Sequence, residues 1–282
     1  MNIKYCIKDK VSLLVIMFRN IVMFPSRFGQ PLFGVEQTPQ IMRFLLDAKN
    51  IYHPIQTKER LDTNLFNLYN KLNTIRSRKL IIGGDHSMSI ATVADSLNRN
   101  PKTKVLWIDA HADINTPESS ISKNIHGMPL SFLTGLSCQK QLLMYTFIKN
   151  KLDFRNLMYI GLRDMDVFEK NILEEKNVDV ITVDELENDF NNSLLKIKNF
   201  ISDSDIHISF DVDCLDPGVF PCTGTKVSGG ITLQTAKHLM DNLNSYPILN
   251  MDLTEINLNL GDKDDKIKSL HNLFYILDKY IN

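Results

Sequence analysis

The stretch "VLWIDAHAD" (Val105–Asp113) places two carboxylates and an imidazole directly after four apolar residues. The apolar run, from Val105 to Ile108, has the length and composition of a strand that is buried on both faces. Asp109, His111 and Asp113 then alternate along the chain, and alternate residues of an extended backbone point to the same side. We therefore predict a buried strand that delivers three polar side chains to one site at its carboxyl end.

The same kind of apolar run recurs on both sides of this stretch. Further runs begin at Leu80, Leu157, Val178, Ile206 and Ile248. Stretches with helical spacing lie between most of them, namely Thr63–Ser77, Ser87–Asn98, Val167–Lys176, Phe190–Ile201 and Thr232–Asn244. This alternation predicts an α/β protein in which helices cover both faces of a mostly parallel sheet. A last amphipathic stretch, Lys266–Ile281, predicts a closing helix.

The bulk composition limits the classes of protein to consider. The chain has 282 residues, and no tract rich in Pro, Gly or Ser divides it, so we predict a single domain over residues 1–282. A net charge of −1 gives no reason to expect nucleic acid or a membrane as a partner. The four cysteines, Cys6, Cys138, Cys214 and Cys222, lack CxxC spacing, which indicates reduced thiols and a cytoplasmic protein.

The most hydrophobic segment is Val11–Phe24. Only eight apolar or small residues precede Arg19 in it, which is too few to span a bilayer. No small-x-small cleavage site follows, so the pattern does not favour a signal peptide. We expect a buried first strand in this segment.

Other apolar runs also end in acidic or imidazole residues. "LIIGG" leads into Asp85 and His86, "IHISF" leads into Asp211 and Asp213, and "ILNM" leads into Asp252 and Glu255. The carboxyl ends of parallel strands lie at one edge of a sheet, where ligands of open α/β sheets bind. We therefore expect these groups to gather with those that follow Ile108.

Clustered carboxylates repel one another unless cations compensate their charge. Two divalent ions would do so, and a donor set of carboxylates and imidazoles without thiolates suits manganese best, with iron, cobalt or nickel as substitutes. Each motif taken alone has a simpler interpretation as a turn or a helix cap. Three such motifs at equivalent strand ends favour a metal site.

The chain resembles the ureohydrolases, and among them the arginases. The matching stretches, in chain order, are "GQPLFGVEQTP" (Gly29–Pro39), "GGDHS" (Gly83–Ser87), "DAHADINTP" (Asp109–Pro117), "SKNIHGMPLSFL" (Ser122–Leu133), "GLRDMD" (Gly161–Asp166), "SFDVDCLDP" (Ser209–Pro217), "TGTKVSGG" (Thr223–Gly230) and "DLTEINLNLGD" (Asp252–Asp262). Lys123 departs from the pattern, because arginases usually have glycine there.

The resemblance implies an arginase-like three-layer α/β/α fold, two Mn²⁺ ions per chain, and hydrolysis of L-arginine to L-ornithine and urea by a metal-bridging hydroxide. It implies the metal ligands His86, Asp109, His111, Asp113, Asp211 and Asp213, with Asp109 and Asp211 shared by both ions. It also makes Asp113 the proton donor to the departing amine and His126 a proton shuttle. Glu255 would hold the guanidinium group, and Thr225 would assist from behind the ligands. A homo-oligomer, either a trimer or a hexamer, is implied as well.

The stretch "NTPESSISKNIHG" separates the substrates within this family. In arginases, the residues that match Asn115, Ser122 and Asn124 receive the substrate carboxylate. The residue that matches Asp166 receives the ammonium group, with Glu169 acting through water. Agmatinases lack this S-x-N-x-H-G pattern. A hydrolase of agmatine or of another guanidino compound remains the alternative, as does a catalytically silent binding or regulatory member, although no metal ligand is lost here.

Overall fold

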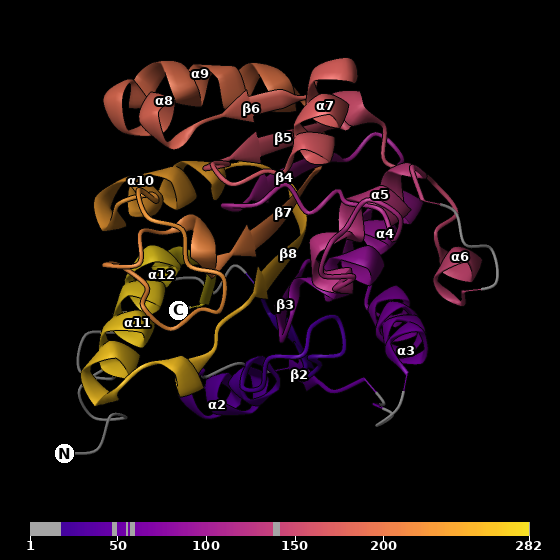
Figure 1. Cartoon of the computed structure of the whole chain (residues 1–282). Helices are drawn as coiled ribbons and strands as arrows, with labels where there is room; N and C mark the ends of the chain where they lie inside the picture. The colour runs from indigo at the N-terminus through magenta and orange to yellow at the C-terminus, as the bar shows by residue number, and fades with distance from the viewer. Residues whose placement is uncertain (1–17, 47–49, 55, 57–59, 138–141, 282) are drawn as a thin grey trace.

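The computed structural model describes residues 18–46, 50–54, 56, 60–137 and 142–281. Eight strands form one sheet in the order β2-β1-β3-β8-β7-β4-β5-β6, and every neighbouring pair is parallel (Figure 1). The strands are β1 (Asn20–Phe24), β2 (Asn50–Tyr52), β3 (Lys79–Gly83), β4 (Lys104–Ile108), β5 (Leu157–Ile160), β6 (Asp179–Ile181), β7 (Ile206–Asp211) and β8 (Ile248–Thr254).

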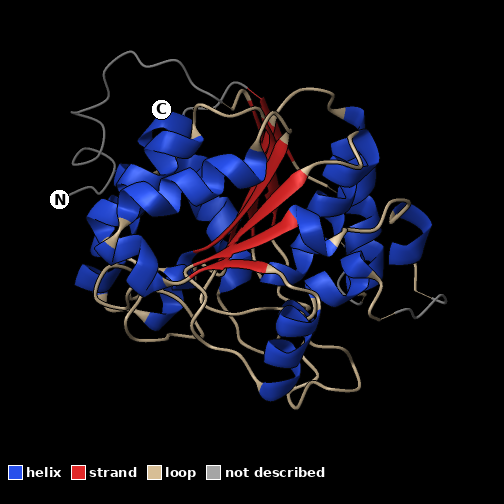
Figure 2. Ribbon diagram, turned by 90° about the horizontal axis from the view of Figure 1, so that it is seen from above, coloured by secondary structure: helices blue, strands red, loops and turns tan. Residues whose placement is uncertain are grey.

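Helices cover both faces of this sheet, which confirms the predicted three-layer arrangement (Figure 2). One face carries α2 (Thr38–Leu45), α8 (Val183–Asn188), α9 (Phe190–Ile201), α10 (Leu233–Leu243), α11 (Lys263–Ile276) and α12 (Asp278–Ile281). The other carries α3 (Leu61–Thr74), α4 (Ser89–Arg99), α5 (Pro129–Thr134), α6 (Met144–Phe147) and α7 (Val167–Glu175). Short 3₁₀ helices are η1 (Val35–Gln37), η2 (His86–Met88), η3 (Ile125–Gly127), η4 (Phe154–Asn156), η5 (Val212–Cys214) and η6 (Leu258–Leu260).

Strand β4 shows why the predicted strands lack alternation of polar and apolar residues. Leu106 and Ile108 pack into the core on one face, and Val105 and Trp107 pack into the core on the other. Because helices cover both faces, successive side chains are all buried, and a continuous apolar run results.

Some predicted elements differ from the structure. The closing helix is divided, because α11 ends at Ile276 and α12 begins at Asp278. Within Val11–Phe24, β1 begins at Asn20, and the residues before Phe18 lie outside the described part of the chain. Cys6 and Cys138 also lie outside it, whereas Cys214 and Cys222 are free thiols, and both are buried. No helix among the described residues is long and apolar enough to cross a membrane.

Strand β8 lies between β3 and β7 in the middle of the sheet. The loops that follow these three strands therefore meet at one edge. The backbone N–H of Glu255, just past β8, donates to the carbonyl of Gly84, just past β3, at 2.9 Å. This contact places Glu255 beside His86 and begins the site described next.

Candidate functional site

Two tight turns aim the acidic side chains at the carboxyl edge of the sheet. Asp109 Oδ1 accepts the N–H of His111 at 2.7 Å, and Asp211 Oδ1 accepts the N–H of Asp213 at 2.9 Å. Each aspartate thus closes a turn around the second residue after it. Strand β4 ends at Ile108, but His111 still forms an isolated parallel bridge with Asp164. Asp113 has a φ of 49°, so the predicted extended backbone does not continue as far as Asp113.

The first cluster surrounds one nitrogen of His86. The Nδ1 atom lies 3.1 Å from Asp109 Oδ2, 2.9 Å from Asp113 Oδ2 and 3.1 Å from Asp211 Oδ2. All four side chains are buried. Nevertheless, the geometry gives Nδ1 no hydrogen-bond partner. A buried nitrogen that faces three oxygens without bonding to any of them fits a site for a cation.

The second cluster lies around His111. Its Nδ1 atom is 3.1 Å from Asp213 Oδ2 and 3.4 Å from Asp109 Oδ1. Thr225 Oγ1 donates to Asp213 Oδ2 at 2.9 Å. His86, Asp109 and Asp211 form one group that could hold a metal ion, and Asp109, His111 and Asp213 form another. Asp109 therefore belongs to both triads.

The pKa shifts within the two triads reflect several carboxylates buried close together. Burial and the neighbouring carboxylate of Asp213 raise the pKa of Asp211 well above its usual range. Burial would lower the pKa of His111, but the carboxylates of Asp109 and Asp213 outweigh it and raise this pKa to about 12. Without metal, protons must take the place of the missing positive charge. A bound metal competes with these protons, so metal affinity should increase with pH.

Trp107 and Ser209 hold the ring of His86, and neither was singled out from the sequence. The Trp107 indole stacks on the His86 ring with centroids 4.3 Å apart, and its Nε1–H donates to Asp109 Oδ2 at 3.0 Å. The Nε2 atom of His86 lies 2.8 Å from Ser209 Oγ. A serine within the short strand-like run "IHISF" was the signal available in the sequence.

Glu255 joins three parts of the site. Its buried carboxylate accepts the backbone N–H of His86 at 2.9 Å and the side-chain amide of Gln30 at 2.6 Å. The Nδ1 atom of His126 lies 3.1 Å from Glu255 Oε1. Burial would lower the pKa of His126, but the Glu255 carboxylate outweighs it and raises this pKa to about 9. Gln30 was not singled out, although it lies in the quoted stretch "GQPLFGVEQTP".

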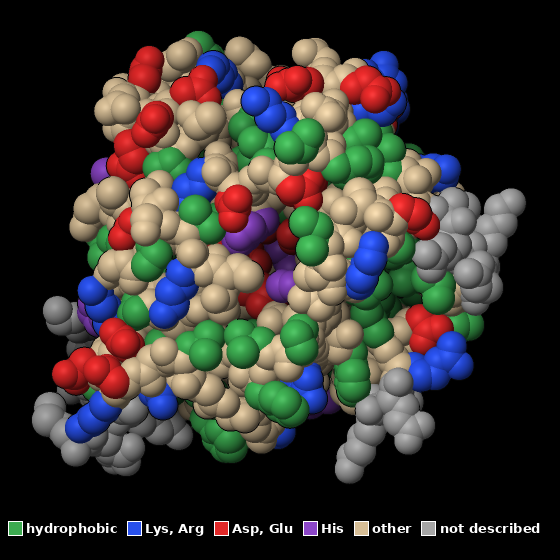
Figure 3. Space-filling model, viewed as in Figure 1, with side chains coloured by type: hydrophobic (Ala, Val, Ile, Leu, Met, Phe, Trp, Pro, Cys, Tyr) green, Lys and Arg blue, Asp and Glu red, His purple; other side chains and the backbone are tan. Residues whose placement is uncertain are grey.

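A cavity of about 150 Å³ opens over these groups. Its histidines and carboxylates lie at the floor of a hollow near the middle of the face shown in Figure 3. It is lined by His86, His111, Asp113, Asn115, Ser120, Ser122, His126, Gly127, Glu169, Asp211, Asp213, Thr225 and Glu255. Of the predicted site residues, Asp109 is buried beneath this lining, and Asn124 and Asp166 are not part of it.

The predicted residues for the amino-acid end of a substrate lie on two facing loops. Asn115 Nδ2 donates to Asp166 Oδ2 at 2.7 Å, which joins one loop to the other. Asp166 also caps α7 by accepting the N–H of Glu169 at 3.0 Å. Burial raises the pKa of Glu169 to about 7. On the first loop, Ser122 Oγ accepts the N–H of Asn124 at 3.2 Å.

Lys123 stands between Ser122 and Asn124 with a φ of 59°. This left-handed conformation favours glycine and costs other residues about 1–2 kcal/mol. The positive φ therefore accounts for the glycine of the family pattern and makes Lys123 a strained residue in this chain.

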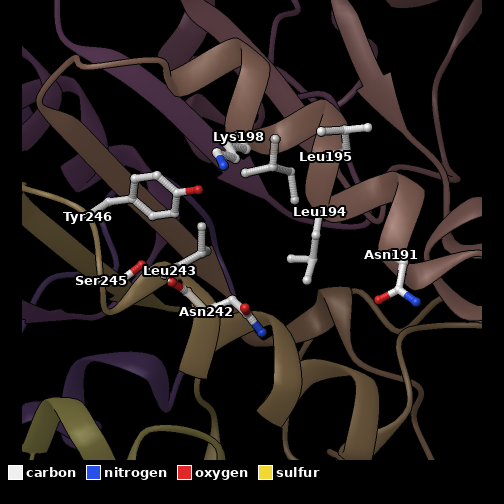
Figure 4. A pocket seen from close by; sticks show the side chains of 9 residues that line it. Asn191, Leu194, Leu195, Lys198, Asn242, Leu243, Ser245 and Tyr246 are labelled. Carbon is white, nitrogen blue, oxygen red and sulfur yellow. Dashed lines mark hydrogen bonds between the residues drawn. The ribbon is translucent and has the colours of Figure 1, made fainter.

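A larger hollow of about 280 Å³ lies away from the triads, between α9 and the end of α10 (Figure 4). It is lined by Asn191, Leu194, Leu195, Ile197, Lys198, Asn242, Leu243, Ser245 and Tyr246. Since this lining contains no histidine, cysteine or carboxylate, it offers neither metal ligands nor an acid–base pair. The smaller cavity is therefore the candidate site.

Several known proteins are similar to this chain in sequence and in fold. The chain is 39% identical to an arginase of Neurospora crassa over 196 residues, which are 66% of this chain and 55% of the relative. It is 37% identical to the mitochondrial arginase-2 of Rattus norvegicus over 204 residues, which are 68% of this chain and 56% of the relative. The chain thus matches little more than half of the length of these curated relatives.

Solved structures match over nearly their whole length. The arginase of Entamoeba histolytica, solved in complex with L-ornithine, superposes with a TM-score of 0.83 at 26% identity, covering 95% of this chain and 99% of that one. An arginase of Bacillus subtilis gives a TM-score of 0.79 at 28% identity, covering 92% and 97%. The sequence model of the arginase family matches residues 38–273. Because this match spans most of the chain and includes both triads, the chain belongs to the arginase family.

Proposed function

We propose that residues 1–282 form one catalytic domain, which hydrolyses L-arginine to L-ornithine and urea with two manganese ions. The observation that carries the proposal is the pair of nitrogen–oxygen triads sharing Asp109 beneath a cavity that Glu255 and His126 also line. The printed names of the relatives and the ornithine in the Entamoeba histolytica complex support the choice of substrate. A cytoplasmic homo-oligomer, either a trimer or a hexamer, is part of the proposal.

The donor set fits manganese. His86 and His111 supply imidazole nitrogens and the aspartates supply oxygens, whereas neither triad contains a thiolate. Two divalent cations held there would lower the pKa of a water molecule and provide a nucleophile at neutral pH. Asp113 lies next to the first triad, with Oδ2 2.9 Å from His86 Nδ1, and completes the proposed ligand set.

We propose that Glu255 holds the guanidinium group of the substrate. Its buried carboxylate lines the cavity, and Oε1 already accepts the N–H of His86 and faces Nδ1 of His126. Oε2 accepts from Gln30 and can accept a further hydrogen bond. A guanidinium group presents paired N–H donors that match a carboxylate. This contact would fix the guanidinium carbon above the triads.

Asp113 and His126 are placed to move protons. One carboxylate oxygen of Asp113 faces His86 Nδ1 at 2.9 Å, which leaves the other to carry the proton that the attacking water loses to the departing amine. The Nδ1 atom of His126 faces Glu255, which leaves Nε2 to exchange protons with solvent at the mouth of the cavity. We infer that Asp113 protonates the amine and that His126 restores the proton.

The other end of the cavity would receive the amino-acid part of the substrate. Asn115 and Ser122 line it, and Asn124 follows on the same loop. We propose that these three bind the carboxylate, and that Asp166 and Glu169 on the facing loop bind the ammonium group. The deciding experiment is urea release by the manganese-loaded protein from L-arginine, with agmatine measured beside it. Faster hydrolysis of agmatine would leave only a guanidino hydrolase, and no urea from either would favour a silent binding or regulatory protein.

The Asn124→Ala variant tests the carboxylate contact. Hydrogen bonds to charged groups contribute about 1.5–3 kcal/mol, so kcat/KM for L-arginine should fall roughly ten- to hundredfold at about 1.4 kcal/mol per factor of ten. The low rate with agmatine should not change, because agmatine has no carboxylate. Steady-state urea release with both substrates measures the two effects. Asn199→Ala, an exposed position on α9, is the matched control. Equal losses with both substrates would show that Asn124 supports the loop instead.

A further inference from the structure

Arg163 follows β5, and its side chain reaches several loops of the site. The guanidinium Nη1 donates to the carbonyl oxygens of Gly161 at 3.2 Å and Cys214 at 3.1 Å. The Nη2 atom donates to the carbonyl oxygens of Asp213 at 2.8 Å and Val227 at 2.7 Å. One side chain thereby connects the end of β5 with the Asp213 turn and with the loop around Val227.

The backbone of Arg163 is bound to the other ligand-bearing turn. The N–H groups of Arg163 and Asp164 both donate to the carbonyl of Ala110, at 3.0 Å and 2.9 Å. Ala110 stands between Asp109 and His111 in the sequence. The backbone of Arg163 therefore binds the turn that carries Asp109 and His111. Its side chain binds the turn that carries Asp213, the third member of the second triad.

The loop that Val227 belongs to contributes Thr225. Its hydroxyl donates to Asp213 Oδ2, the oxygen that faces His111. The carbonyl of Val227, two residues later, accepts from the same guanidinium that binds the carbonyl of Asp213. The relative position of the Thr225 hydroxyl and the Asp213 carboxylate therefore depends on Arg163.

Among the described residues, Arg163 forms no ion pair, its four side-chain hydrogen bonds all go to backbone carbonyls, and its buried Nε has no partner. Four carbonyls in different directions require a rigid planar group with several N–H donors. A lysine ammonium has one nitrogen on a flexible stem and cannot replace this geometry. The arrangement therefore needs the guanidinium group of arginine, and a positive charge of another shape would not be sufficient.

We propose that Arg163 is a positioning residue that sets the geometry of the second triad, formed by Asp109, His111 and Asp213. This inference rests on the proposed metal-dependent function. Arg163 does not line the cavity, and it acts only through the backbone of the ligand-bearing turns. Groups that orient metal ligands typically change metal affinity about 10–100-fold when they are removed.

The test is calorimetric titration of metal-free protein with Mn²⁺ alone. Arg163→Lys should weaken one of the two binding events by roughly 10–100-fold and leave the other, assigned to His86, Asp109 and Asp211, unchanged. Hydrogen exchange of residues 213–230 should become faster in the same variant. Arg155→Lys is the matched control, since Arg155 stands at the opposite end of β5 and pairs with exposed Asp153.

Each outcome separates the inference from the proposed function. If the unmodified protein binds no Mn²⁺, the metal-dependent function itself fails. If it binds two ions and Arg163→Lys binds both with unchanged affinity, only the role of Arg163 is overturned. Equal weakening of both events, or loss of the fold in both Arg163→Lys and Arg163→Gln, would likewise overturn it, because Arg163 would then serve general stability.

Discussion

Replacement of Asp109 by asparagine is expected to remove metal binding and nearly all activity. Asp109 belongs to both triads, with Oδ2 facing His86 and Oδ1 facing His111. The amide keeps the shape of the side chain but loses its charge and one acceptor oxygen. Removal of a group that only orients a ligand costs about 10–100-fold in metal affinity, so loss of a shared ligand should exceed roughly 10³-fold.

This variant should nevertheless fold. In the metal-free state, the charge of Asp109 repels the neighbouring carboxylates and contributes to the raised pKa of Asp211. Removing that charge also removes its attraction to His86 and His111, which outweighs burial and holds the pKa of Asp109 well below its usual range, so the melting temperature without metal should fall. The stabilisation by added Mn²⁺ should disappear. Metal content after dialysis, thermal unfolding and urea release measure these effects. Asp184→Asn, an exposed position on α8, is the control. Retention of two tightly bound ions would disprove the shared-ligand role.

Replacement of His126 by asparagine should lower turnover while metal binding persists. His126 lies outside both triads, and its Nδ1 contacts Glu255. General acid–base groups contribute about 10²–10⁴-fold to rates, and a loss in kcat of that size is expected, with a smaller change in KM. Added imidazole should restore part of the rate. His238→Asn on the exposed face of α10 is the matched control.

The direction of the pKa shift of His126 determines how the stability of the metal-free protein should depend on pH. The pKa of His126 is raised to about 9, so its interaction with Glu255 is fully present below the ordinary pKa of histidine, near 6.5, and is lost as the pH rises through about 9. In the metal-free protein, the stability contributed by this pair should disappear over that window, and His126→Asn should abolish the change. Thermal unfolding between pH 6 and about 10 measures it. If His126→Asn released urea at the rate of the unmodified protein across this pH range, His126 would be a structural residue.

The strands and the acidic groups at their ends were predictable because each depends on local sequence. Apolar runs such as Val105–Ile108 are bounded by polar residues, and the parallel sheet brings their ends together. The short edge strand β2 and the short helices α6 and α8 were missed, because three to six residues show no clear period. Local patterns also could not reveal that the backbone leaves the extended conformation at Asp113, whose φ is 49°.

Supporting contacts between distant segments were the least predictable part of the site. Gln30 binds Glu255, and Arg163 binds the carbonyl of Val227, across long stretches of chain. Glutamine and arginine are common surface residues, so their type alone does not indicate such a role. The roles of Asn124 and Asp166 remain predictions, because neither lines the cavity.

The central place of β8 determines when this protein can fold. Strands β1 to β3 and strands β4 to β7 have no contact within the sheet until β8 joins β3 to β7. A chain still on the ribosome, before Ile248 has emerged, therefore exposes two unpaired parallel edges, which are prone to aggregation. Such long-range pairing also slows folding. Chaperone demand during synthesis should accordingly end only after the β8 segment is released.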